Sequence, residues 1–137
     1  MTYELMATTT LAAAVTASLT DTVSTKRPYA SAFIKADFAY GAGGTTCKAW
    51  VQCSADRGTT WHDVCNFAFA TTAAIKFFNL SALTAVTTQG TAVDGTTSDN
   101  TAVDGTLTQL FRVKYTTTGT YSGASSLKIW MVTRDLA

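Results

Sequence analysis

The sequence predicts an all-β fold, an antiparallel β-sandwich of jelly-roll-like type, and three observations lead to that prediction. Threonine makes up roughly a fifth of the 137 residues, and its β-branched side chain suits a pleated surface better than a helix interior. Apolar and polar residues alternate with a period of two in several segments, as in half-buried strands. Turn signals separate these segments into six or more short strands, which is typical of a sandwich or jelly roll.

Little charge is present, and this limits the partners that we expect. Charged residues make up 14% of the chain and the formal net charge is +1, whereas binding to nucleic acid needs many cations. Residues 5–19 lack the basic start and the unbroken apolar run of a secretory signal. No segment approaches the roughly 20 apolar residues of a membrane span. We therefore expect neither nucleic acid nor a membrane as a partner.

The three cysteines, Cys47, Cys53 and Cys65, are odd in number and lack the C-x-x-C spacing, which favours free thiols in a reducing cytoplasm. Cys47 and Cys53 lie on one predicted strand with Cα atoms about 20 Å apart, too far for a disulfide. Cys65, on the next strand, could face either of them across a hairpin. An internal or intersubunit disulfide therefore stays open.

The N-terminal part has little periodicity. Residues 8–25 are rich in Thr, Ala and Ser, and we expect residues 1–27 to form an extended arm or a first strand, with a short helix as the lesser alternative. Pro28 then breaks any regular element, because it pushes Arg27 out of helical geometry. A single β-sandwich domain is expected over residues 28–137, which is long enough for one core.

Regular alternation begins after this arm. In the first predicted strand Ile34 and Phe38 share one face, while Phe33 and Lys35 share the other. In the third, alternation places Asp63 on the same face as Cys65 and the phenylalanines that follow. The strands expected in this half of the sandwich cover residues 30–40, 47–54, 61–69 and 74–80.

A long loop is expected over residues 81–106, which contain no aromatic residue. Thr-Ala-Val-Asp-Gly-Thr occurs at 91–96 and again at 101–106, and each Val-Asp-Gly reads as a turn. A loop of this length in a compact domain usually has a function or is mobile. Two strands, 107–115 and 127–133, complete the predicted fold.

The segment Ser-Ala-Asp-Arg-Gly-Thr-Thr-Trp at 54–61 resembles the Asp-box pattern of sialidases and other β proteins. Its physical reading is a hairpin in which the aspartate caps backbone N–H groups of its own turn and the glycine takes a positive φ. In families that carry the box it is a fold element distant from the catalytic centre, so the resemblance implies no sialidase chemistry. The residues assigned to this structural turn are Ser54, Asp56, Gly58, Thr60 and Trp61.

Residues arranged for catalysis are hard to find in the sequence. His62 is the single histidine and has no obvious triad or metal partner, and no two carboxylates form a recognisable acid–base pair. Asp94, Asp99, Asn100 and Asp104 could offer oxygens to Ca²⁺, but their spacing matches no calcium loop and favours solvated turn residues. We therefore expect no enzyme, with no catalytic residue, cofactor or metal.

The aromatic residues exceed what one inner face of a small sandwich needs. Near 77–78 and 130 the strands place large apolar groups on both faces, so that either the fold or a neighbouring subunit covers the second face. The residues predicted to lie at an interface are Phe77, Phe78, Val93, Val103 and Trp130.

The order of these features resembles a group of small β-sandwich proteins of tailed bacteriophages, commonly encoded near the major capsid protein. The resembling segments, within about residues 30–133, are 48–65, 67–69, Phe-Asn-Leu-Ser at 78–81 and Leu-Phe-Arg-Val-Lys-Tyr-Thr at 110–116. The resemblance implies a cement or decoration protein that dimerises or trimerises and bridges capsid subunits. The cysteines and the 81–106 insert depart from the pattern, which leaves the oligomeric state and the position in the particle open.

The expected function is therefore that of a virion structural protein, a capsid decoration protein assembled in the host cytoplasm. Its expected partners are the major capsid protein or other virion subunits and further copies of itself, with the arm (1–27) and the loop (81–106) as contacting elements that order on binding. One alternative is a component of the phage tail tube or baseplate. A second is a carbohydrate-binding module that stacks exposed Trp or Tyr rings on sugars.

Overall fold

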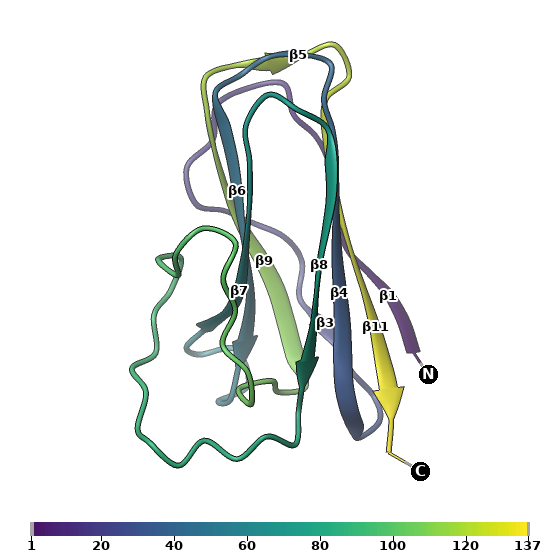
Figure 1. Ribbon diagram of the computed structural model, residues 1–137, viewed down its shortest axis with the longest axis vertical. Coiled ribbons are helices and arrows are strands. Elements are labelled where there is room, and N and C mark those ends of the chain that lie inside the picture. The colour runs from purple at the N-terminus through teal and green to yellow at the C-terminus, as the bar shows by residue number, and fades with distance from the viewer. Residues whose placement is uncertain (1, 137) are drawn as a thin grey trace.

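The computed structural model describes residues 2–136, and the side chains of residues 6–136. Met1 and Ala137, the outer ends of the predicted arm and domain, lie outside the described residues. Two antiparallel sheets pack face to face (Figure 1), and no helix occurs in residues 2–136. The predicted all-β sandwich is confirmed. Within the same residues no helix is present that could cross a membrane.

The two sheets differ in how their strands are ordered. Sheet A has the spatial order β1 (Thr2–Thr10), β11 (Ser126–Asp135), β4 (Tyr29–Ala39) and β8 (Ala74–Ser81). Sheet B has the order β2 (Ser18–Leu19), β9 (Leu110–Thr118), β6 (Thr46–Ser54) and β7 (His62–Phe69), and β3 (Val23–Ser24) also pairs with β9. At one end of the sandwich β5 (Ala42–Gly43) pairs with β10 (Tyr121–Ser122).

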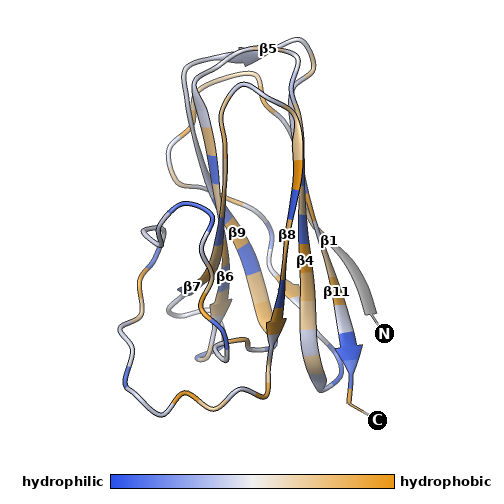
Figure 2. Cartoon of the chain, in the orientation of Figure 1, coloured by the Kyte–Doolittle hydropathy of each residue, from blue (hydrophilic) through white to orange (hydrophobic). Residues whose placement is uncertain are grey.

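The core lies between the two sheets, and the period-two alternation decides which side chains enter it. On β4 the inward residues Ile34 and Phe38 are buried, while Phe33, just before Ile34, points outward and is exposed. Apolar segments recur along the strands of both sheets in Figure 2. The largest fully buried side chains are Tyr121, Phe38, Phe67, Phe111, Ile34, Leu127, Ile129, Met131, Gln52, Val51, Val64 and Val113.

A β-bulge in β7 overturns one predicted face. Val51 lies opposite Cys65, but the next residue, Gln52, lies opposite Asp63, so that Val64 is the extra residue. A bulge adds one residue to one strand. Residues two positions apart on opposite sides of it therefore point to opposite faces of the sheet. The prediction that Asp63 shares a face with Cys65 is therefore wrong, and Asp63 joins Gln52 on the outer face of sheet B.

The N-terminal segment belongs to both sheets. β1 pairs with β11 from Thr2 opposite Thr133 to Thr10 opposite Ser126, and β2 and β3 then pair with β9 in sheet B. The alternative of a first strand is therefore correct for Thr2–Thr10, whereas the short helix is wrong. Residues 2–27 thus contribute strands to both sheets, and the predicted boundary before residue 28 lies between β3 and β4.

The three cysteines are free and buried. Burial raises the pKa of the Cys47 and Cys53 thiols to about 12, and burial also raises the pKa of Cys65 far above its usual value. These thiols stay protonated and act as small apolar side chains of the core. No disulfide joins them, and an intersubunit disulfide would need the core to open.

Candidate interaction surface

The segment between β8 and β9 lies over the outer face of sheet B and along its β7 edge (Figure 1). The backbone N–H of Asp63 donates to the Val93 carbonyl at 2.8 Å, and the N–H of Val103 donates to the Val64 carbonyl at 2.8 Å. Next to the second of these bonds, Cys65 and Ala102 form an antiparallel bridge. The predicted long loop is thus ordered by contacts within the chain, and it pairs with an edge strand that would otherwise be open.

The two Thr-Ala-Val-Asp-Gly-Thr copies form matching turns that fasten this loop at two places. Gly95 and Gly105 occupy equivalent positions with φ of +83° and +77°, a region that favours glycine. The aspartate before each glycine then binds a different sheet. Asp94 accepts hydrogen bonds from Lys114 on β9, whereas Asp104 accepts one from the backbone N–H of Ser81 on β8 at 2.6 Å.

These loop aspartates are exposed to solvent, as the sequence suggested, and they also bind the sandwich. Asp99 pairs with Lys48 at 3.0 Å, and Asn100 accepts hydrogen bonds from the backbone of Ala68 and from Lys76. Each side chain is engaged at a different place on the sandwich. Within the described residues no group of three or more His, Cys, Asp or Glu side chains converges as metal ligands would.

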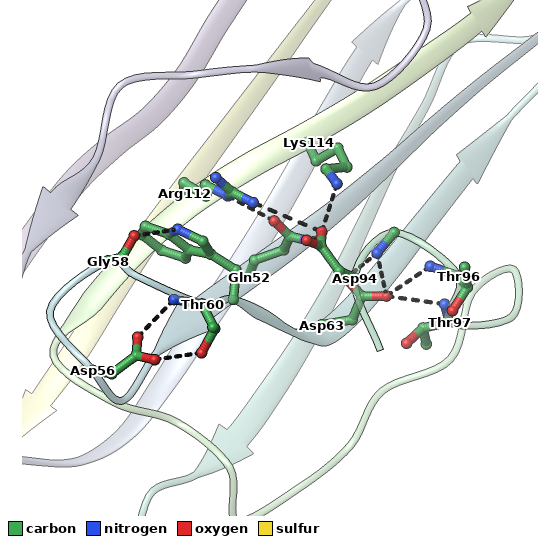
Figure 3. Close-up of polar contacts among 12 residues, drawn as sticks. Gln52, Asp56, Gly58, Thr60, Asp63, Asp94, Thr96, Thr97, Arg112 and Lys114 are labelled. Atoms are coloured by element: carbon green, nitrogen blue, oxygen red, sulfur yellow. Dashed lines mark hydrogen bonds and ion pairs between the residues drawn. The ribbon is translucent and has the colours of Figure 1, made fainter. Parts of the chain in front are cut away.

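Asp63 holds the loop most directly (Figure 3). Its carboxylate accepts hydrogen bonds from three successive backbone N–H groups, those of Gly95 at 2.8 Å, Thr96 at 2.9 Å and Thr97 at 3.0 Å. It also accepts one at 2.8 Å from the amide of Gln52, which is itself fully buried. Sequence reasoning missed this cluster, because alternation without the bulge assigned Asp63 to the inner face.

A second polar group of the cluster, Asp94, has its pKa set by opposing effects. Partial burial favours the neutral acid, but hydrogen bonds from Lys114 at 2.5 Å and Gln52 at 2.6 Å outweigh it, together with the charges of Lys114 and Arg112. The pKa of Asp94 is therefore lowered. A carboxyl with a lowered folded-state pKa stabilises the fold above its unfolded pKa, and this contribution is lost as the pH falls through the folded pKa.

The first prediction follows from the lowered pKa of Asp94. The protection factors of the loop amides should be high near neutral pH and should fall as the pH drops below about 4, where an unperturbed aspartate begins to protonate. The charge-free variant Asp94→Asn should show faster loop exchange already at pH 6, by up to about fivefold, since exposed ion pairs contribute at most about 1 kcal/mol. Intrinsic exchange rates measured on an unstructured peptide provide the correction. Equal loop protection in both proteins at pH 6 would contradict the assignment.

The Asp-box-like segment forms a compact turn between β6 and β7 (Figure 3). Asp56 accepts hydrogen bonds from the hydroxyl of Thr60 at 2.5 Å, from its backbone N–H at 2.8 Å, and from Ser54 at 2.9 Å. These bonds to Thr60 above all lower the pKa of Asp56 to about 2. Gly58 has a φ of +91°, and its carbonyl accepts a hydrogen bond from the Trp61 indole at 3.2 Å. The five residues assigned to the turn therefore meet in one hairpin.

This hairpin also contacts the loop anchors. The Arg112 guanidinium lies 4.3 Å from the centre of the Trp61 ring, and its Nε donates to the Gln52 amide oxygen at 2.8 Å. Arg112 therefore connects the turn to the Gln52 and Asp63 cluster. These contacts hold the β8–β9 loop against the outer face of sheet B.

The outer face of sheet A is left without such a cover by the described chain. Ile75 and Phe77 are 61% and 63% exposed, and Trp130 and Phe33 are 39% and 37% exposed. The rings of Phe33 and Phe77 stack with centroids 5.1 Å apart. The outward residues of β11, β4 and β8 form three rows across the sheet. In the order β11, β4, β8 the rows are Lys128, Asp37, Ile75; Trp130, Lys35, Phe77; and Val132, Phe33, Asn79. We call these nine residues the sheet A face.

The five residues predicted to lie at an interface are not in one place. Phe77 and Trp130 belong to the sheet A face, whereas Phe78 is half-buried against Phe67 in the core, with ring centroids 5.3 Å apart. Val93 and Val103 lie beside β7, where they line a cavity of about 440 Å³. The same cavity contains His62, whose Nε2 lies 2.8 Å from the Thr106 carbonyl. Phe33, Ile75 and Lys35, which also belong to the sheet A face, were missed although the same alternation placed Phe33 and Lys35 together.

The fold and the surface define an antiparallel β-sandwich with one face covered by its own loop and one apolar face open. No family model matches this chain, and neither a curated protein nor a solved structure shows a significant similarity to it.

Proposed function

We propose that this chain is a structural subunit of a virus particle, a capsid decoration protein that works by binding to other protein subunits. The observation that carries the proposal is the sheet A face. It gathers Ile75, Phe77, Phe33 and Trp130 on one flat surface, with the first two more than half exposed. A cluster of large apolar side chains in the open marks a protein interaction site more often than an ordinary surface.

The contacts of the loop and of the N-terminal segment favour a binding role for this face over those two segments. The loop and the N-terminal segment make their hydrogen bonds within the chain, so neither needs a partner to become ordered. We therefore assign docking to sheet A, and not to the arm and the loop that the sequence suggested. Many copies that each make a modest contact would brace a closed lattice through avidity, and the net charge of +1 lets them pack closely.

The second prediction tests docking by this face. The double variant Ile75→Ser/Phe77→Ser should bind at least tenfold more weakly to capsids assembled without this chain, because burying one such side chain contributes about 1.5–3 kcal/mol. Leu19→Ser is the matched control, since Leu19 is exposed on β2 in the other sheet, and it should bind like the parent. Binding is measured by co-sedimentation, with thermal unfolding as a check on folding.

Electron microscopy of purified particles gives the complementary test. Stoichiometric copies of the chain on the head lattice are expected. Copies confined to the tail would replace the proposal with the tube or baseplate alternative, and absence from the particle would refute it. The stacked Phe33 and Phe77 rings beside Trp130 also suit a sugar ring, so binding on a glycan array with no binding to capsids would favour a carbohydrate-binding module instead.

A further inference from the structure

Lys35 has an unusual position in the sheet A face. It lies on β4 between Trp130 on β11 and Phe77 on β8, its direct register partners. Phe33, two residues away on the same face of β4, is a third aromatic neighbour, and Asp37 lies two residues away in the other direction. Lys35 is half-buried there, and it makes no hydrogen bond or ion pair with any residue in the described part of the chain.

Any protein that covers the aromatic side chains must also cover this ammonium group. Removing a charge from water without a partner is costly, because an apolar environment offers nothing in place of its hydration. Lysine is a compact and strongly hydrated charge, which makes the demand for acceptors stricter than for arginine. A surface that is apolar throughout therefore does not fit the sheet A face, whereas an apolar surface with a carboxylate at its centre does.

The charges around the face identify the class of partner further. Lys128 and Arg134 are exposed on β11, and Asp37 is the one carboxylate among the outward residues of β4, β8 and β11. Two copies of this chain packed face to face would therefore oppose more cations than they could pair. Like charges juxtaposed across an interface disfavour a partner, so the complementary surface belongs to a different protein with an excess of acidic side chains.

We propose that the partner of the sheet A face is an acidic surface of a different virion protein, which places an aspartate or glutamate carboxylate on Lys35 inside a ring of apolar contacts. This inference rests on the proposed function and names the chemistry of its partner. The aromatic side chains supply the buried area, and the central ion pair fixes the register of one subunit on the other. Rim cations on β11 add attraction at longer range, which acts mainly on the association rate.

The third prediction measures the central charge directly, with capsids assembled without this chain as the probe. Lys35→Met keeps the apolar stem but removes the charge, and it should weaken binding about 30-fold or more, because it leaves a buried carboxylate unpaired. Lys35→Glu should weaken it further, and Lys35→Arg should restore most of the affinity. Lys26→Glu is the matched control, since Lys26 is an exposed lysine outside the sheet A face, and it should change the dissociation constant by less than about fivefold.

Zero-length crosslinking identifies the partner group. A carbodiimide joins a lysine amine to a carboxylate as an amide with loss of water, so assembled particles should give a peptide in which Lys35 is linked to Asp or Glu of another protein. A link from Lys35 to Asp37 of a second copy would overturn the inference in favour of a symmetric dimer. Unchanged binding of Lys35→Met, with binding lost in Ile75→Ser/Phe77→Ser, would refute the central charge but keep the docking face. If the unaltered chain does not bind capsids, the proposed function itself fails.

Discussion

Phe38→Ala is expected to lower the free energy of unfolding by about 3–5 kcal/mol, the range for truncating a buried phenylalanine. Phe38 is 1% exposed. Its ring stacks on Phe69 with centroids 4.9 Å apart and meets the edge of Tyr121 at 5.7 Å. Truncation removes both ring contacts and leaves a cavity where the two sheets meet. Urea denaturation followed by tryptophan fluorescence measures the change.

Phe33→Ala is the matched control for this experiment. Phe33 lies on the same strand, but its ring is on the outer face, where it stacks on Phe77. We expect a loss of about 1 kcal/mol or less, in the range of a partly exposed aromatic pair. Comparable losses from the two substitutions would show that β4 does not have one buried and one open face, and both the fold and the docking surface would then need revision.

Asp63→Ala is expected to have the second-largest effect, a loss of about 2–4 kcal/mol in the free energy of unfolding. Hydrogen bonds to a charged group contribute about 1.5–3 kcal/mol each, but water that reaches the freed loop would replace part of this. The three N–H groups of Gly95, Thr96 and Thr97 lose their shared acceptor, and the buried Gln52 amide loses one of its partners. Chemical denaturation measures the loss.

Amide hydrogen exchange separates a local effect of Asp63→Ala from a global one. The amides of residues 95–97 should lose protection first, while the amides of β4 and β11 should follow the global stability. Asp63→Asn is the informative comparison, because it retains one acceptor oxygen without the charge and should fall between the parent and the alanine variant. Slow exchange at residues 95–97 in the alanine variant would contradict the role of Asp63 as the loop anchor.

The two sheets differ in whether their outer surface is covered by the chain itself. Residues 93–103 shield the β7 edge of sheet B, and the Asp63 and Asp94 carboxylates hold them there. The β-sandwich therefore needs no partner on that side. Sheet A has no corresponding segment over its outer face in the described chain, and its apolar residues are available for contacts with other proteins.

The sequence by itself determined the fold class and much of the core. Alternation places Ile34 and Phe38 on one face and Phe33 and Lys35 on the other, and the structure has the same arrangement. This succeeds because side chains in a strand point to opposite faces whatever the strand pairs with. The turn at residues 54–61 was equally accessible, since its hydrogen bonds join residues no more than four positions apart.

Only the tertiary structure decided how distant segments combine. The bulge at Val64 turned Asp63 toward a loop about thirty residues further along the chain, and no local pattern signals that contact. Pairing of β1 with β11 joins the two ends of the chain. The position of Lys35 among Trp130 and Phe77 likewise depends on the registers of two other strands. Where no bulge intervenes, local spacing determines which face a side chain occupies, but its neighbours on that face depend on how the strands pair.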